Sequence, residues 1–133
     1  MIDIENYVFD AVARAVRAEF PEINAVSRTV LTPSEFPCVS VTEADSYVYE
    51  GSIDSGGIEH HAWLMYEVNV FSNRKTGAKE ECRAIFKTVD RVMAGMGFLR
   101  TGRTPVREDE PTQYRLAGRY RGVADENKDI YVR

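Results

Sequence analysis

The stretch IEHHAWLMYEVNVFSNRKTGAKEECRAIFKTVDRVMAGMGF, residues 58–98, contains the two patterns that decide the fold of this chain. In residues 58–71 apolar side chains alternate along one face, and the opposite face is also largely apolar, which predicts a long strand covered on both faces. Beyond the turn SNRKTGAKE, apolar side chains recur at steps of three and four residues, which predicts an amphipathic helix over about 78–95. Gly95 and Gly97 supply the C-terminal exit of this helix.

Another amphipathic helix is predicted at the N-terminus, from Asp3 to Phe20. Charged side chains fill the positions between its apolar residues, so one face of the helix is expected to be buried. Asp3 suits the N-cap position, and Pro21 ends the helix because the residue before a proline resists the α region. The apolar positions are Ile4, Tyr7, Val8, Ala11, Val12, Ala15, Val16 and Phe20.

The remaining segments predict a set of strands whose order gives the fold class. Strands are expected at 23–31, 38–50, 58–71, 98–103, 113–123 and 129–132. The element order is therefore α–β–β–β–α–β–β–β, with GSIDSGG at 51–57 as the tip between two long strands. Short loops between antiparallel neighbours and two helices over one face favour an α+β fold, a mainly antiparallel sheet packed against two helices. We expect residues 1–133 to form one such domain.

Composition and charge exclude several classes of protein. With 44% hydrophobic and 29% charged residues, the 133-residue chain is typical of a globular domain and unlike collagen, a coiled coil or a wholly disordered protein. No apolar run reaches the ~18 residues of a membrane span, and the acidic start is unlike a signal peptide. We therefore expect a cytoplasmic protein with no membrane partner.

The charges are unevenly distributed along the chain. Residues 1–60 hold 11 acids and three bases, a net charge of −8, whereas residues 61–133 hold 10 acids and 14 bases, a net charge of +4. The two halves are expected to meet either inside the fold or between copies of the chain. A contact between copies would be head to tail, and such contacts close into a ring when the rotation permits.

Patterns for catalysis, metal binding and cofactor binding are weak. His60 and His61 are adjacent, so in a strand they point to opposite faces and cannot chelate one metal together. Cys38 and Cys82 show no CxxC spacing, and each is expected to be a small buried hydrophobe. GSIDSGG and MAGMGF lack the spacing of phosphate-binding loops, and the acidic triplet at 108–110 is typical of a solvated loop. We expect no catalytic residue, no metal and no cofactor.

Residues 44–59, ADSYVYEGSIDSGGIE, are expected to form a flexible hairpin loop suited to protein contacts. Tyrosine among acids, glycine and serine is an adaptable binding composition, and an ordinary hairpin without a partner is the alternative. The candidate contact residues are Asp45, Tyr47, Tyr49, Glu50 and Asp54.

A second candidate surface lies on the strand 113–123. Side chains alternate along a strand, so Arg115, Arg119 and Arg121 share one face. Burying three arginines without partners is costly, so this face is expected to meet water, acids of a neighbouring subunit, or internal carboxylates. The internal candidates are Glu43 and Glu67.

Three segments together resemble a group of small neck and tail proteins of long-tailed bacteriophages and prophages. They are FPCVSVTEAD at 36–45, YEVNVFSNRKTGAKEECRAIFKTVDRVMAGMGFLRT at 66–101 and YRLAGRYRGVADENKDIY at 114–131. The most specific part is 66–101, which comprises a strand ending in VFSN, a helix and the sequence GFLR. The closing strand with Arg119, Tyr120 and Arg121 is the second marker.

The resemblance to tail terminators implies an α+β fold and a ring, usually of six copies, in the tail or neck of a virion assembled in the host cytoplasm. Such a ring caps the head-proximal end of the tail tube, stops tube polymerisation and provides the surface on which the head docks. The implied partners are other copies of the chain, the tail tube protein and a head-completion or connector protein, with DNA only as cargo through the lumen.

The resemblance also suggests tasks for the two candidate surfaces. The loop residues would contact a neighbouring subunit or the tube, and the arginine face would contact a subunit or line the lumen. The family has no catalytic residues to carry over, so we expect no enzyme. A head–tail connector or completion protein of the neck is the alternative, and a small-molecule-binding module is a more remote one.

Overall fold

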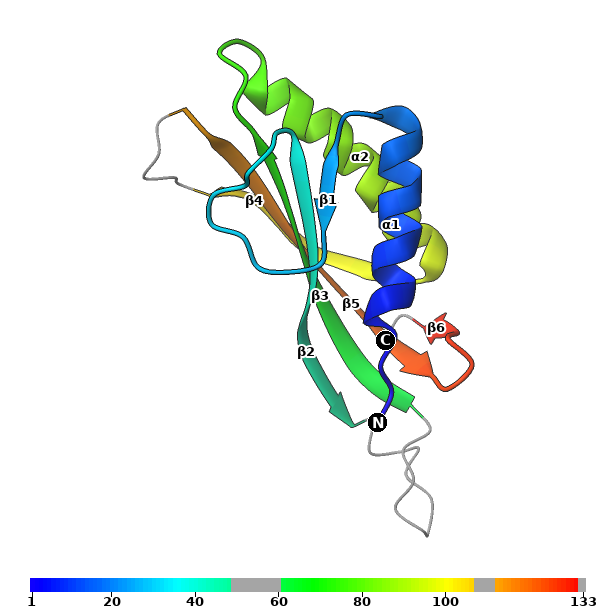
Figure 1. Cartoon of the computed structure of the whole chain (residues 1–133). Coiled ribbons are helices and arrows are strands. Elements are labelled where there is room, and N and C mark those ends of the chain that lie inside the picture. The colour runs from blue at the N-terminus through cyan, green and yellow to red at the C-terminus, as the bar shows by residue number, and fades with distance from the viewer. Residues whose placement is uncertain (49–60, 107–111, 132–133) are drawn as a thin grey trace, which may run out of the picture.

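The computed structural model describes residues 1–48, 61–106 and 112–131, and in these residues two helices pack on one face of a six-stranded sheet (Figure 1). The α+β class and the predicted order of elements are confirmed. The elements are α1 (Glu5–Glu19), β1 (Asn24–Val26), β2 (Cys38–Val48), β3 (His61–Ser72), α2 (Ala78–Met96), β4 (Leu99–Val106), β5 (Tyr114–Asp125) and β6 (Ile130–Tyr131).

The sheet has the strand order β1-β2-β3-β5-β4, with β6 paired to the end of β5. The β1–β2 pair is parallel and the other pairs are antiparallel. The two central strands, β3 and β5, pair along twelve residues, from His61 opposite Asp125 to Ser72 opposite Tyr114. These long antiparallel strands form the platform on which both helices pack.

Two predicted boundaries are wrong for a physical reason that the structure shows. The strand expected at 23–31 is only the three residues of β1, because the chain then leaves the sheet and the carbonyl of Arg28 accepts a hydrogen bond from the Ser40 hydroxyl at 2.6 Å. The loop expected at 44–59 overlaps the strand expected at 38–50, and the strand prediction is right for residues 44–48, which belong to β2 and of which 45–48 pair with β3. A bulge between Glu43 and Asp45 lets the strand continue there.

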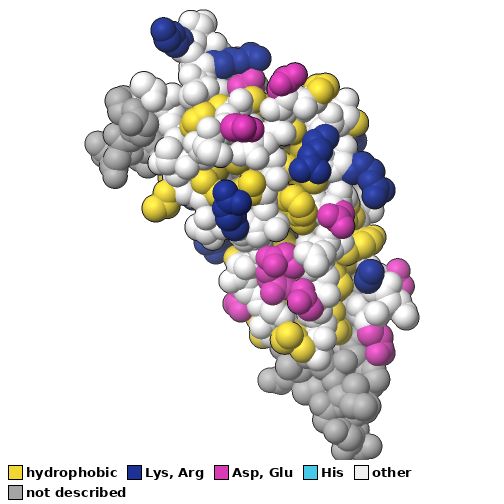
Figure 2. Space-filling model, viewed as in Figure 1, with side chains coloured by type: hydrophobic (Ala, Val, Ile, Leu, Met, Phe, Trp, Pro, Cys, Tyr) yellow, Lys and Arg dark blue, Asp and Glu magenta, His cyan; other side chains and the backbone are white. Residues whose placement is uncertain are grey.

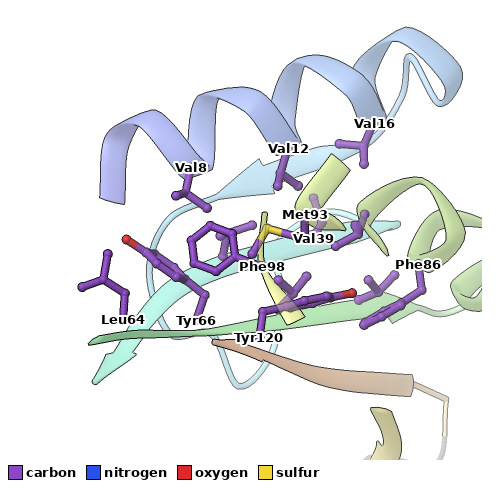
Figure 3. Close-up of a cluster of buried hydrophobic side chains, with 14 of the residues drawn as sticks. Val8, Val12, Val16, Val39, Leu64, Tyr66, Phe86, Met93, Phe98 and Tyr120 are labelled. Atoms are coloured by element: carbon purple, nitrogen blue, oxygen red, sulfur yellow. The ribbon is translucent and has the colours of Figure 1, made fainter. Parts of the chain in front are cut away.

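The core lies between the helices and the even-numbered side chains of β3 and β5. Figure 3 shows Val8, Val12 and Val16 of α1 pointing toward the same layer as Tyr66 and Tyr120. Each large apolar side chain that is fully buried here contributes about 1.5–3 kcal/mol to folding. Further buried residues of this core are Val39, Val41, Leu64, Val68, Val70, Ile85, Phe86, Val89, Met93 and Leu116.

Close packing of α2 on the sheet depends on Gly118 in β5. A Cβ atom at this position would overlap the ring of Phe86, so glycine lets the phenyl ring lie directly on the strand. Phe86 also stacks on Tyr120, with 6.3 Å between ring centroids. Gly97, at φ 109°, ends α2 in the left-handed conformation and turns the chain into β4.

The helix-free face of the sheet is covered at one end only. Phe71 and Asn69 are buried there, beneath the segment 27–37, and Gln113 donates a hydrogen bond to the carbonyl of Leu31 at 3.2 Å. From His61 to Glu67 the same face of β3 is only partly buried. The prediction of a strand covered on both faces therefore holds for one half of β3.

Both cysteines are buried and unpaired, as the sequence predicts for small core residues. Burial raises the pKa of the Cys38 thiol to about 11 and that of the Cys82 thiol to about 12. Neither thiol therefore carries appreciable thiolate near neutral pH. In the described residues, neither helix is long and apolar enough to cross a membrane.

Candidate interaction surfaces

The three arginines of β5 share the helix-free face, but they lie in two different environments. Arg115 donates from Nε to Asn69 Oδ1 at 2.8 Å and lies 3.9 Å from Glu67, and Arg119 donates to Glu67 Oε2 at 2.9 Å. The Glu67 carboxylate therefore joins two of the arginines, which confirms one of the internal partners considered from the sequence. The arginine side chains are 18% and 58% exposed, respectively.

Glu43, the other internal partner considered, is on the wrong face of the sheet. It lies opposite Tyr66 in the register, and the Tyr66 hydroxyl contacts Glu43 Oε1 at 3.5 Å on the helix side. Thr42, not Glu43, lies opposite Glu67. The expectation that Glu43 pairs with the arginine face is therefore wrong, because period-two alternation sends its side chain the other way.

Arg121 packs on an aromatic side chain. Its guanidinium lies 5.7 Å from the centroid of the Trp63 ring, and Trp63 stacks on Tyr47 with 6.1 Å between centroids. Leu99 lies opposite Arg121 on β4 and is 40% exposed, while Tyr131 is 45% exposed beside His61. We call Tyr47, Trp63, Leu99, Arg121 and Tyr131 the aromatic patch.

Three residues of the aromatic patch, Trp63, Leu99 and Tyr131, were not predicted from the sequence as surface contacts. Each belongs to a predicted strand, but their proximity follows from the pairing of β3 with β5 and of β5 with β4 and β6. Side chains alternate between the two faces of a strand, and the odd-numbered positions of β3 and β5 lie on one face. This alternation was the one sequence signal that could have placed Trp63 with Arg121.

The candidate loop residues fall into two groups. Asp45 and Tyr47 lie on β2, where Asp45 Oδ1 accepts the backbone N–H of Ser46 at 2.8 Å and Tyr47 is half exposed. Tyr49, Glu50 and Asp54 lie outside the described residues, as do His60 and the acidic triplet 108–110. The two described candidates are thus strand residues of a sheet edge rather than loop residues.

A row of four side chains crosses the sheet from one edge to the other on the helix side. In the register, Glu43 lies opposite Tyr66, Tyr66 opposite Tyr120, and Tyr120 opposite Arg100. We call Glu43, Tyr66, Tyr120 and Arg100 the tyrosine row. Its acid is on β2 and its base on β4, so the row ends in opposite charges.

Each buried tyrosine of the row contacts a carboxylate. The Tyr120 hydroxyl donates to Asp90 Oδ1 of α2 at 3.0 Å, and Arg100 lies 3.3 Å from the same oxygen. Tyr66 contacts Glu43, whose pKa is raised by burial and by the neighbouring carboxylates of Asp3 and Glu5. Burial is also the first cause of the raised pKa of both tyrosines.

Comparison with models of known protein families finds no match, and a search of curated proteins finds no relative. Function is therefore proposed below from the surfaces and from the segments that resemble tail proteins.

The described residues form several open hollows between the elements. One hollow of about 650 Å³ lies where the end of α1 meets α2 and is lined by Glu19, Arg83, Lys87 and Arg91 among others. Glu19 joins the two helices there, since it accepts hydrogen bonds from the Thr88 hydroxyl and from Arg91, and these bonds lower its pKa. Across the described residues, no three His, Cys, Asp or Glu side chains gather closely enough to hold a metal ion.

Proposed function

We propose that this chain is a structural subunit of a phage tail, and that copies of it form a ring, usually of six copies in the family it resembles, which caps the head-proximal end of the tail tube. The ring stops tube polymerisation and gives the head a docking surface. The observation that carries this proposal is the resemblance of residues 66–101 to tail terminators. In the fold this segment is one continuous unit, from the middle of β3 through α2 to the start of β4.

The distribution of open surface supports this proposal. A ring subunit needs contacts with two neighbours, with the tube below and with the head above. The chain leaves β4 exposed at one edge and half of the helix-free face only partly covered, and it carries the aromatic patch on that face. Aromatic side chains and arginine are the residue types enriched at protein interfaces.

The candidate residues take different roles under this proposal. Arg115 and Arg119 share Glu67, so they stabilise the face itself, whereas Arg121 extends over Trp63 and is available to a neighbouring subunit or the lumen. Asp45 and Tyr47 contact a neighbouring subunit or the tube from the edge of β2. The proposal includes no catalytic step and no cofactor, and DNA passes only as cargo.

Electron microscopy of particles made by a phage lacking this gene tests the proposed function directly. We expect overlong tails without heads, because nothing would stop the growth of the tube. Full heads beside tails of normal length would contradict the capping role and assign the protein to the connector or completion step of the neck. Ordinary infectious particles would overturn the structural role altogether.

A further inference from the structure

The β4 edge of the sheet is open along almost its whole length. Residues 99–105 are all exposed, and in the described chain β4 has a paired strand on one side only, namely β5. The charged side chains of this edge are Arg100, which bonds Asp90, and Arg103, whose guanidinium lies 5.8 Å from the Phe86 ring. The charges that β4 itself carries are therefore both positive, with the apolar side chain of Leu99 at the start of the strand.

The opposite edge is acidic. β1 pairs with Cys38, Val39 and Ser40 only, so in the described residues the outer side of β2 has no strand partner from Val41 onward. The carboxylates gathered there are those of Asp3, Glu5, Glu43 and Asp45. Figure 2 shows acidic side chains clustered on this side of the molecule.

Two backbone donors of the acidic edge are already bonded within the chain. Glu5 Oε2 accepts the N–H of Glu43 at 2.7 Å, and Asp45 Oδ1 accepts the N–H of Ser46 at 2.8 Å. An incoming strand would have to displace these carboxylates in order to pair with the backbone. We therefore expect the carboxylate side chains of this edge, and not its backbone, to bind the partner. The groups of the partner that face them are expected to be cations.

We propose that copies of this chain join head to tail through these two edges, with the arginines of the β4 edge of one copy facing the carboxylates of the β2 edge of the next. The inference rests on the proposed ring and names its subunit interface. The two edges differ, so the contact is heterologous, and repeating it builds a ring or a filament rather than a closed pair.

The tyrosine row indicates which residues of the two edges lie side by side in this contact. Glu43 and Arg100 are its two ends, so copies placed side by side without a shift bring Arg100 of one copy to Glu43 of the next. Burial, and after it repulsion from Asp3 and Glu5, raises the pKa of Glu43, and an incoming guanidinium offsets the repulsion.

Reciprocal charge exchange tests the interface. The pair Asp45→Lys with Ser46→Lys adds three positive charges to the acidic edge, and the pair Thr101→Glu with Arg103→Glu adds three negative charges to the basic edge. All four positions are exposed. Each variant alone should weaken self-association at low salt by at least about tenfold in sedimentation velocity and native mass spectrometry. An equimolar mixture should restore it, because each altered edge then meets an opposite charge.

A matched control places the same charge change away from both edges. Arg83→Glu with Ala84→Glu adds three negative charges to exposed positions of α2 and should leave self-association unchanged. Circular dichroism melts verify that every variant is folded. Folded edge variants that associate like the wild type, a mixture that fails to restore association, or a wild-type chain that stays monomeric at low salt would each overturn the proposed interface.

Tube length separates this inference from the proposed function. Rings that form through these edges but do not limit the length of tubes assembled in vitro would remove the capping function and leave the interface standing. Folded edge variants that all limit tube length normally would remove the interface and leave the capping function standing.

Discussion

At each end of the tyrosine row a buried tyrosine hydroxyl contacts a carboxylate, but the negative charge of that carboxylate is balanced at one end only. At the β4 end, Tyr120 donates to Asp90, and the charge of Asp90 is balanced by Arg100. At the β2 end, Tyr66 contacts Glu43, which is repelled by the carboxylates of Asp3 and Glu5. One end is complete within a single chain, and the other carries an excess of negative charge.

This difference suggests that one end of the row stabilises the fold of a single copy and that the other end serves association between copies. The balanced end fixes α2 to the sheet, because Asp90 is a helix residue that accepts from a strand residue. The acidic end adds little to the stability of one copy, since like charges repel there. Under our proposal it gains its opposite charge from the next copy.

The largest expected effect tests whether the apolar packing is equal at the two ends. Phe86 stacks on Tyr120, and Phe98 meets Tyr66 edge-on at 5.4 Å between ring centroids. Phe86→Ala and Phe98→Ala should each lower the free energy of unfolding by about 3–5 kcal/mol, because each removes a buried ring and leaves a cavity. Urea denaturation of both variants measures this, and a large difference between them would show that the ends are not equivalent in packing.

Neutralising the two carboxylates should have effects of opposite sign. Asp90→Asn should lower the free energy of unfolding by about 1–2 kcal/mol, because Arg100 loses its ion pair and Tyr120 donates to a neutral acceptor. Glu43→Gln should leave stability unchanged or raise it by up to about 0.5 kcal/mol, since it relieves repulsion with Asp3 and Glu5. Equal destabilisation in thermal melts at pH 7 would contradict the comparison.

Removing the two hydroxyl groups should give smaller and unequal losses. Tyr120→Phe should lower the free energy of unfolding by about 1–1.5 kcal/mol, because its 3.0 Å bond to Asp90 is lost and the carboxylate remains. Tyr66→Phe should lower it by less than about 1 kcal/mol, because its contact with Glu43 is long, at 3.5 Å. Chemical denaturation of both variants measures the two losses in the free energy of unfolding and shows which hydrogen bond contributes more.

The smallest expected effect is a pH dependence that comes from the acidic end. The pKa of Glu43 is raised above its ordinary value of 4.5, so the folded chain holds this proton more tightly than the unfolded chain. Stability should therefore fall as the pH rises from about 4.5 through the raised pKa. The difference in melting temperature between the wild type and Glu43→Gln should grow over this range, and a constant difference would contradict the assignment.

The fold was predicted best where the period of the apolar pattern and the length of the segment indicate the same type of element. The strand at 58–71 and the helix at about 78–95 appear within a few residues as β3 and α2, because each has a long, uninterrupted apolar pattern. Residues 44–48 were covered both by the strand expected at 38–50 and by the loop expected at 44–59, and they belong to β2, since the glycine and serine run begins only at position 51. The bulge at Glu43 and Asp45 has no clear sequence signal.

The candidate surfaces were only partly predictable. Alternation was enough to place Arg115, Arg119 and Arg121 on one face, because period two holds within any strand. Choosing Glu67 over Glu43 as their partner required the register between β3 and β5, which depends on contacts far apart in the chain. The aromatic patch required the same knowledge, because its members come from several strands.

The strands β2 and β4 both bulge beside the tyrosine row. One irregularity lies between Glu43 and Asp45 in β2, and the other between Arg100 and Gly102 in β4. A bulge bends its strand and increases the local twist. An array of copies joined at this level would therefore acquire a repeated bend at every joint, so that curvature is a property of each subunit and does not have to be imposed by the tube on which the array assembles.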